Sequence, residues 1–183
     1  MSTAAGCCLF DTAVGRCGIA WTAQALVQAV QLPEADDVRT LARMRKRCGD
    51  APQSTPPEAV ADVIARLQAA LAGTRDPLLD VPLDWDGVPQ FHRQVYEAAR
   101  RIAPGSYVTY GEMARDLGQP GAARAVGQAL GHNPFAPLVP CHRILAADRG
   151  SGGFSAEGGT RTKLRLLEIE GAVLGDGPGL FDA

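Results

Sequence analysis

The sequence predicts an α+β fold, in which a small N-terminal antiparallel-sheet domain precedes a mostly helical C-terminal domain with a helix-turn-helix. Three observations predict it: two short strand-like runs around a glycine turn, apolar residues at helical spacing from residue 60 onward, and two short helices around a second glycine turn. The 183 residues are 46% hydrophobic and 21% charged, which is typical of a globular chain with a sizeable core. This composition excludes a disordered chain, a collagen-like repeat and a coiled coil.

The first segment is predicted to form a hairpin and a third strand. Residues 9–12 and 17–22 flank a turn that contains Gly15, and residues 25–32 follow as the third strand. Residues 39–48 carry five basic side chains. We expect this run to be a solvated helix or loop rather than an arm that binds nucleic acid, since most charge runs cover a surface.

An amphipathic helix follows a proline-containing loop over residues 50–57. Its apolar side chains recur at i, i+3, i+4, i+7 and i+11: Val60, Val63, Ile64, Leu67 and Leu71. Residues 76–89 contain three prolines and few periodic positions, so we place the domain boundary there. The predicted division is an N-terminal domain over residues 1–85, a second domain over 86–173 and a frayed tail over 174–183.

The second half is predicted to be mostly helical. Five apolar residues mark one face of its first helix: Phe91, Val95, Tyr96, Ala99 and Ile102. Thr109 and Glu112 then form a capping box that opens a short helix. After a turn at residues 119–121, residues 122–130 form the second helix of a helix-turn-helix, a unit found in proteins with and without DNA contacts.

Charge and cysteine content limit the possible functions. The chain has 18 basic and 20 acidic residues, a net charge of −2, so it has no global basic surface for nucleic acid. Residues 86–173 hold 10 basic and 8 acidic side chains, a net of +2, and would carry any DNA-facing surface. The five irregularly spaced cysteines favour a reducing cytoplasm over a secreted disulfide framework. No apolar run reaches the ~18 residues of a membrane span and no signal peptide is recognisable, so we expect a cytoplasmic protein without a membrane partner.

The most informative stretch contains Cys141, followed by His142 and Arg143. A thiol is a strong nucleophile as the thiolate, and a neighbouring base or positive charge lowers its pKa. The alternative is that Cys141 is only a small buried hydrophobic residue. A zinc site is disfavoured because the chain has no Cys-x-x-Cys pair.

The second half closely resembles the methylated-DNA–protein-cysteine S-methyltransferases, also called O6-alkylguanine-DNA alkyltransferases. The matching residues follow in unbroken order over about 80 positions: 91–96, 109–112, 123–127, 133–134, 140–143, 153–155, 163 and 166–171. The Pro-Cys-His-Arg run at 140–143 is the most specific of them. The first half fits the variable N-terminal domain of this family only loosely.

The resemblance implies DNA repair by direct, stoichiometric and irreversible transfer of an alkyl group to Cys141. The donor would be O6-alkylguanine, with O4-alkylthymine as a second candidate, and the base would be flipped out of the duplex. His142 would act as base through a bridging water, oriented by Glu170, while Tyr110 assists the leaving guanine. Asn133 would brace the turn that leads to the cysteine. No group that could regenerate the thiol is apparent, so each molecule would act once.

The resemblance also implies how DNA is held. The second helix of the helix-turn-helix would enter the minor groove and present four residues to it: Ala123, Arg124, Ala125 and Gly127. Arg124 would fill the gap left by the flipped base. Four residues would line the base pocket: Val139, Pro140, Phe154 and Ser155. Phe154 stands where many relatives have a tyrosine, and the glycine-rich loop after it is longer than theirs.

We therefore expect double-stranded DNA carrying alkylated guanine as the partner, no cofactor, no metal and a monomer. One alternative is a helix-turn-helix protein that binds lesions without catalysis, although alkyltransferase-like binders lack the thiol. A second is a cysteine hydrolase, which would need an oxyanion hole and turnover. A sensor of the same family with an added metal-binding domain would need a four-cysteine pattern, which the first half lacks.

Overall fold

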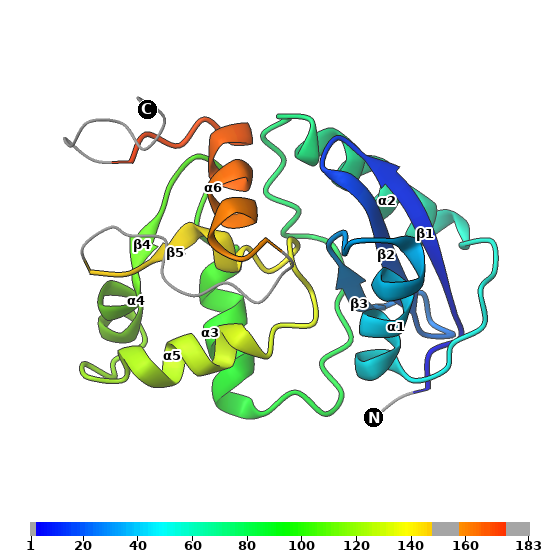
Figure 1. Cartoon of the computed structure of the whole chain (residues 1–183). Coiled ribbons are helices and arrows are strands. Elements are labelled where there is room, and N and C mark those ends of the chain that lie inside the picture. Colours follow the sequence, from blue (N-terminus) through cyan, green and yellow to red (C-terminus); the bar gives the residue numbers. More distant parts are fainter. Residues whose placement is uncertain (1–2, 148–157, 175–183) are drawn as a thin grey trace.

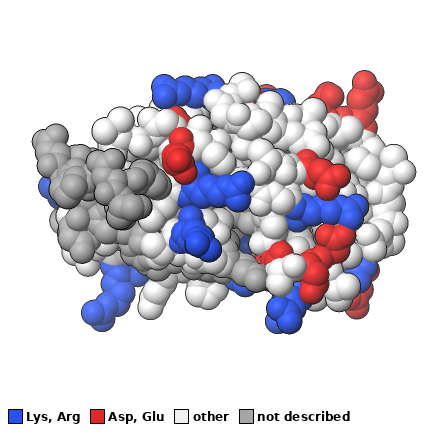
Figure 2. Space-filling view, turned by 45° about the horizontal axis from the view of Figure 1, so that its top comes forward, with Lys and Arg blue, Asp and Glu red and all other residues white. Residues whose placement is uncertain are grey.

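The computed structural model describes residues 3–147 and 158–174, and it confirms the predicted α+β class. Figure 1 shows the three-stranded sheet with α1 and α2 at the right and helices α3 to α6 at the left. Figure 2 shows acidic side chains gathered mainly over the N-terminal half, at the right of that view, whereas basic side chains are spread over both halves. The described part of the chain has no helix long and apolar enough to cross a membrane.

The N-terminal sheet has the order β1-β2-β3 and is antiparallel throughout. Its strands are β1 (Gly6–Thr12), β2 (Gly15–Trp21) and β3 (Val27–Gln31). The predicted hairpin and third strand are therefore present. The first strand starts earlier than expected because Cys7 and Cys8 continue the ladder opposite Ala20 and Ile19.

Helices α1 (Asp37–Cys48) and α2 (Glu58–Leu71) cover opposite faces of this sheet. The predicted α2 buries Val60, Val63, Leu67 and Leu71. The predicted solvated helix or loop is a helix, α1, but one of its faces is not solvated: every fourth side chain there is buried, at Thr40, Met44 and Cys48. The basic side chains occupy the other faces, so this charge run belongs to an amphipathic helix.

The edge of β3 that faces away from β2 is covered by other parts of the chain. Val27 exchanges backbone hydrogen bonds with the linker, accepting from Asp84 N and donating to Pro82 O. Val30 N donates to Pro134 O at 2.8 Å, in the loop that precedes Cys141. The sheet thereby holds the segment that leads to the predicted nucleophile.

The C-terminal half contains the predicted helices. They are α3 (Gln90–Arg100), α4 (Tyr110–Asp116), α5 (Ala123–Gly131) and α6 (Thr160–Ile169). The capping box is present: Thr109 Oγ1 accepts from Glu112 N at 3.2 Å, and Glu112 Oε2 accepts from Thr109 N at 2.7 Å. Helices α4 and α5 pack together as the predicted helix-turn-helix.

A short parallel pair that the sequence did not predict joins two distant parts of this half. Strand β4 (Val108–Thr109) pairs with β5 (Ile144–Leu145), with Val108 opposite Ile144. Strand β4 runs directly into α4, and β5 directly follows the 3-10 turn Cys141–Arg143. The pair therefore brings the start of the helix-turn-helix to the predicted nucleophile.

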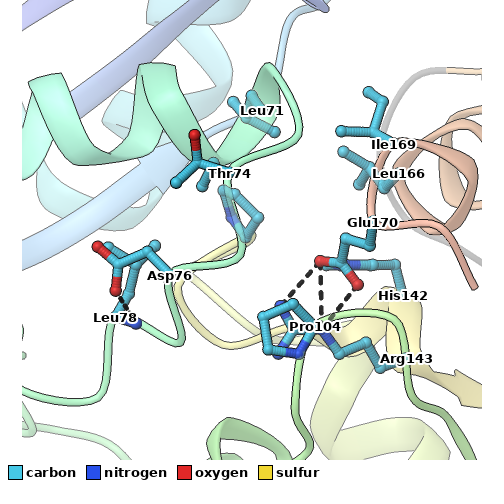
Figure 3. Close-up of a pocket in the computed structure, with 12 residues that line it drawn as sticks. Leu71, Thr74, Asp76, Leu78, Pro104, His142, Arg143, Leu166, Ile169 and Glu170 are labelled. Atoms are coloured by element: carbon cyan, nitrogen blue, oxygen red, sulfur yellow. Dashed lines mark hydrogen bonds and ion pairs between the residues drawn. The ribbon is translucent and has the colours of Figure 1, made fainter.

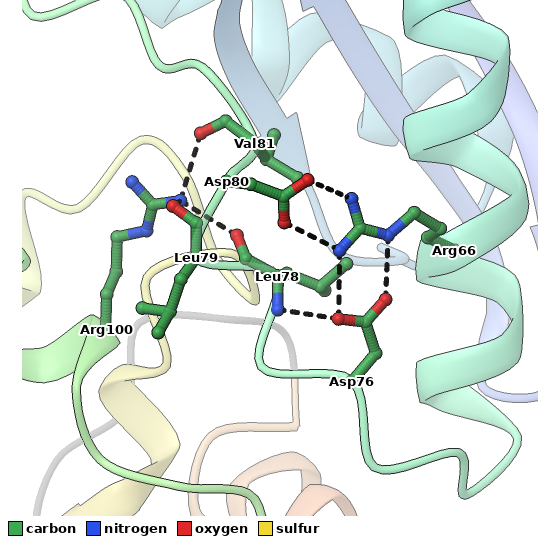
Figure 4. A network of polar contacts seen from close by, with 7 residues as sticks. All are labelled: Arg66, Asp76, Leu78, Leu79, Asp80, Val81 and Arg100. Carbon is green, nitrogen blue, oxygen red and sulfur yellow. Dashed lines mark hydrogen bonds and ion pairs between the residues drawn. The ribbon is translucent and has the colours of Figure 1, made fainter.

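The linker between the two halves is held from both sides, as Figure 4 shows. Arg66 on α2 makes paired hydrogen bonds to Asp76 at 2.7 and 2.9 Å and to Asp80, both at 2.8 Å. Arg100 on α3 donates to three linker carbonyls, those of Leu78, Leu79 and Val81. The bidentate bonds of Arg66 and the carbonyl contacts of Arg100 fix the linker geometry. One continuous hydrophobic core runs through both halves.

Candidate active site

Cys141 is the first residue of the 3-10 turn and lies in the wall of a cavity of about 810 Å³. It is buried, with 6% of its surface exposed. The same cavity is lined by Tyr110 from α4 and by Arg124 and Gly127 from α5. The thiol therefore lines a cavity that is also lined by both helices of the helix-turn-helix. The volume of this cavity is within the range of small-molecule sites.

Glu170 joins His142 and Arg143, the two residues that follow Cys141 in the turn, as Figure 3 shows. Nε2 of His142 lies 2.8 Å from Oε1 of Glu170. Arg143 binds both oxygens of the same carboxylate at 2.8 to 3.2 Å and also donates to Ile102 O. Arg143 thus supports the loop and the carboxylate and does not face the cavity.

The charge states of this pair follow from its surroundings. Burial alone would raise the pKa of Glu170, but hydrogen bonds from His142 and Arg143 outweigh it and lower the pKa to about 2. Burial lowers the pKa of His142, although Glu170 opposes that effect. At neutral pH the site therefore holds a carboxylate and a neutral imidazole. Because the carboxylate can only accept, the imidazole proton lies on Nε2 and Nδ1 keeps its lone pair.

Nδ1 of His142 is buried and has no hydrogen-bond partner among the described residues. A buried imidazole nitrogen with a free lone pair is suited to accept a proton. The Glu170 carboxylate on the opposite nitrogen would stabilise the imidazolium that results. This arrangement is a base with its orienting group, placed one residue after a thiol.

Gly105 holds Glu170 from a further segment. Its backbone N–H donates to Oε2 of Glu170 at 3.3 Å, and its φ is +83°. A Cβ added there would lie 2.9 Å from Glu170 O, too close for any other residue without a shift of the backbone. Glycine is therefore required at the Pro-Gly break that follows α3.

The thiol itself is in a mixed environment. Burial raises the pKa of Cys141, while the amide of Asn133 and the positive charges of Lys163 and Arg47 lower it. Asn133 braces the preceding turn: its amide donates to Val139 O at 2.9 Å, and its Oδ1 accepts from Phe135 N at 2.9 Å. Asn133 thus fixes the chain that presents the thiol.

The N-terminal half also contacts this turn. Arg47 at the end of α1 donates a hydrogen bond to Asn133 O. Trp85 packs its ring edge-on against Phe135 with centroids 5.5 Å apart. Together with the bond from Val30 to Pro134, these contacts come from three different segments of the first half. The turn before Cys141 is therefore built by both halves of the chain.

The structure places four of the residues singled out from the sequence around the turn that carries the Cys141 thiol: His142, Glu170, Tyr110 and Asn133. Ala123, Arg124 and Gly127 line the same cavity, and Arg124 is exposed. Ala125 is half-buried and Val139 and Pro140 are buried, and none of these three lines the cavity. Phe154 and Ser155 lie outside the described residues.

Two charged residues of the site were not assigned a role from the sequence. Arg47 lies in a charge run whose pattern gives no sign of a distant contact. Lys163 was part of the family match, and that match was the available signal; its burial on α6 is seen only in the structure. A separate cavity of about 30 Å³, room for one water, lies behind Glu170, with α2 and the linker forming its far wall (Figure 3).

Metal ligands are not clustered in the part of the chain that the structure describes. No group of three or more His, Cys, Asp or Glu side chains there could hold a metal ion. The five cysteines are all free thiols.

Comparison with known proteins connects this site to a family. The family model "6-O-methylguanine DNA methyltransferase, DNA binding domain" matches residues 90–172. The methylated-DNA–protein-cysteine methyltransferase of Mycolicibacterium paratuberculosis is 43% identical over 114 residues, which cover 62% of this chain and 67% of that protein. A DNA base-flipping protein of Thermus thermophilus is 44% identical over 107 residues, 58% of this chain and 70% of that protein.

A solved structure extends the likeness to the first half. The crystal structure of Mycobacterium tuberculosis OGT in complex with DNA has a TM-score of 0.73 and 33% identity. The match covers 91% of this chain and 92% of that one. Both halves of the fold are thus shared with a solved structure of this kind, and the sequence match of residues 90–172 includes the thiol. The chain belongs to the methylated-DNA–protein-cysteine methyltransferase family.

Proposed function

We propose that this protein repairs DNA by moving an alkyl group from O6 of a guanine to Sγ of Cys141. The observation that carries the proposal is the position of the thiol. Cys141 lines a cavity bounded by a helix-turn-helix, and it directly precedes His142, whose Nε2 is held by Glu170 and whose Nδ1 can accept a proton. A reactive thiol at a DNA-facing opening fits a lesion that must leave the duplex to be reached.

In the proposed reaction, the Cys141 proton passes to Nδ1 of His142, directly or through one water. Glu170 stabilises the imidazolium through Nε2. The thiolate attacks the alkyl carbon in line with the C–O bond, so an S–C bond forms while the C–O electron pair leaves with guanine. Tyr110, in the same cavity wall, supplies the proton that the leaving base takes up. The thioether is stable, so each molecule reacts once.

DNA would be held by α5, the second helix of the helix-turn-helix. Arg124 is exposed in the first turn of this helix and lines the cavity, so it can enter the duplex where the base leaves. The helix has small residues at positions 123, 125 and 127 (Ala123, Ala125 and Gly127), which would let its backbone approach the minor groove closely. Phe154 and Ser155 are proposed to complete the base pocket.

We further propose a division of work between residues 1–85, which support the turn before the thiol, and residues 86–173, which bind DNA and carry the chemistry. The partner would be double-stranded DNA with an alkylated guanine, bound by a monomer. O4-alkylthymine is the second candidate substrate because it presents an alkyl group on an equivalent exocyclic oxygen.

The test is the intact mass of the protein after mixing with an oligonucleotide that contains O6-methylguanine. The expected result is a gain of one methyl group per molecule, located on Cys141 by peptide mapping, and no gain with Cys141→Ser. Product beyond one equivalent of protein, or methylation at another residue, would contradict single transfer to this thiol.

A second candidate is a base-flipping protein that binds lesions and leaves the chemistry to others, as the name of the Thermus thermophilus relative suggests. Tight binding of the methylated oligonucleotide without any change in protein mass would favour this candidate. The buried thiol beside an oriented base favours transfer.

A further inference from the structure

Lys163 is a charged residue in the core that the proposed mechanism leaves unused. It lies on α6 with 0% of its surface exposed. Its Nζ donates to Ile144 O at 2.6 Å and lies 5.5 Å from the centre of the Tyr110 ring. Among the described residues, no carboxylate forms an ion pair with it. The ammonium thus contacts the strand that follows the 3-10 turn and the face of an aromatic residue in the cavity wall.

An ammonium in this position needs a negative partner. Transfer of a charged amine from water into a protein core is unfavourable unless other groups compensate its charge. Burial lowers the pKa of Lys163 to about 8, and the negative form of Cys141 raises it. The reverse also holds, because Lys163 lowers the pKa of the thiol. The carbonyl and the aromatic face supply only partial charges. Within residues 3–147 and 158–174, the ionised thiol of Cys141 is the negative group that favours the charged form of Lys163.

We propose that Lys163 is the resident positive charge of the transfer site, stabilising the thiolate of Cys141 before the reaction and the phenol oxygen of Tyr110 during it. The first part concerns the thiol alone. The second part rests on the proposed alkyl transfer, because it requires a leaving base that takes a proton from Tyr110.

The charge balance of the transfer explains why one cation can serve both groups. When the S–C bond forms, sulfur loses its negative charge and the C–O electron pair moves to guanine. Guanine takes the Tyr110 proton, so the negative charge reappears on the phenolate, whose ring lies beneath Nζ. The proton held on His142 since the thiol ionised then restores the phenol. Lys163 keeps its own proton and faces a negative group at each stage.

Other charged groups near the thiol come from several elements, and they act differently. Arg47 from α1 also favours the thiolate, so some positive charge remains when Lys163 is removed. Lys163 and Arg143 both lower the pKa of His142, which Glu170 raises. Lys163 therefore favours an ionised thiol without favouring an ionised imidazole. Tyr96 on α3 is buried, and its raised pKa keeps it neutral.

The experiment measures the reactivity of the thiol without DNA. Iodoacetamide modification of Cys141 is followed by peptide mass spectrometry from pH 6 to pH 10 in the wild type and in Lys163→Met. Methionine is an unbranched side chain, one atom shorter than lysine, and removes the charge. We expect the apparent pKa of the thiol to rise by about one unit and the rate at neutral pH to fall about ten-fold. Lys163→Arg should restore most of the rate.

The matched control is Arg161→Met, which removes a positive charge from the exposed face of the same helix. It should leave the thiol profile unchanged. Equal profiles for the wild type and Lys163→Met would overturn the proposal, and so would equal shifts in both variants. Far-ultraviolet circular dichroism and thermal melting identify any variant that does not fold.

A second measurement uses only the wild type, so it does not depend on the folding of a variant. The side-chain nitrogens of lysine are labelled, and Lys163 is titrated by NMR before and after Cys141 is capped with methyl methanethiosulfonate. Capping removes the negative charge, so the pKa of Lys163 should fall. An unchanged titration would overturn the proposal.

Single-turnover repair of an O6-methylguanine duplex then tests the second part. Lys163→Met should lower the repair rate at saturating DNA by a larger factor than the iodoacetamide rate at Cys141 falls at the same pH. Lesion affinity should stay unchanged. If the repair rate falls only by the factor by which the thiolate fraction of Cys141 falls, Lys163 has no separate role at Tyr110. Absence of repair by the wild type, together with shifted thiol profiles, would refute the proposed function and leave the thiolate role intact.

Discussion

The Arg47 guanidinium, on a helix of the N-terminal half, donates a hydrogen bond to the backbone carbonyl of Asn133, eight residues before the thiol. Arg47 is half-buried, and its positive charge lowers the pKa of Cys141. One side chain thus connects the first half both to the turn that presents the thiol and to the charge of the thiol.

Replacing Arg47 by Met should therefore affect both stability and reactivity. The orphaned Asn133 carbonyl should cost about 1–3 kcal/mol of unfolding free energy in urea titrations. The iodoacetamide rate at Cys141 should fall several-fold because a cation is lost. Lys46→Met, at the exposed neighbouring position, is the control. A stability loss with an unchanged thiol rate would limit Arg47 to a structural role.

Glu170→Gln should remove a pH-dependent part of the stability. The pKa of Glu170 is lowered from an ordinary value of 4.5 to about 2, so its stabilisation is present above pH 4.5 and is lost as the pH falls toward 2. The wild type should lose about 2–3 kcal/mol more than Glu170→Gln over this interval. Urea unfolding at stepped pH measures the difference. If the unfolding free energies of the wild type and Glu170→Gln fell in parallel with pH, the ionised Glu170 carboxylate would not stabilise the fold.

The same pair should act as a unit in alkyl transfer. His142→Ala and Glu170→Gln should each slow the single-turnover rate at saturating DNA and leave lesion affinity nearly unchanged. The loss in the double variant should be smaller than the product of the two single losses, because Glu170 acts through His142. Fully multiplicative losses would mean that Glu170 only supports the end of α6. Lost affinity at an unchanged rate would place both residues in DNA recognition.

Arg124→Ala should separate flipping from chemistry. If the side chain occupies the place of the extruded base, repair of duplex DNA should slow by about ten-fold or more, since flipping costs a few kcal/mol. The reaction of Cys141 with the free base O6-methylguanine needs no flipping and should change little. Equal losses on both substrates would instead indicate damage to the fold or to the thiol.

Gly127→Ala should show how closely α5 approaches DNA. An added Cβ would lie 3.8 Å from the Tyr110 ring, an ordinary contact, so the protein tolerates it. Alanine is also the better helix former by up to about 1 kcal/mol, and thermal stability should rise or stay equal. Affinity for duplex DNA should nevertheless fall several-fold. Unchanged affinity would mean that this face of the helix does not reach the groove.

The elements with local signals were predicted well. The α2 stripe, the capping box at Thr109 and Glu112, and the helix-turn-helix were predicted from spacings within about one or two turns of chain, and the structure confirms them. The core face of α1 was not predicted, because Thr40, Met44 and Cys48 are a sparse apolar set among arginines. Propensity alone does not separate a buried stripe of this kind from a solvated run.

The site was predictable where the chemistry lies next to the thiol in sequence, and less so where distant segments meet. The parallel pair of Val108 with Ile144 involves strands of two residues, too short for any periodicity. The contact of Arg47 with Asn133 spans 86 positions and depends on how the two halves pack. The role inferred for Lys163 depends on burial, which the sequence of α6 alone could not distinguish from a charge at the surface.

The covered edge of β3 has a consequence for how the protein can be divided. That edge is covered by the linker and by the Pro134 carbonyl of the loop before the thiol. If residues 1–85 were expressed alone, the linker would still cover Val27, but the N–H of Val30 would lose the Pro134 carbonyl. That part of the strand edge would be unpaired and open to pairing with other copies of the chain. The segment would thus be prone to aggregation, and the C-terminal half acts as an intramolecular solubility partner for the first half.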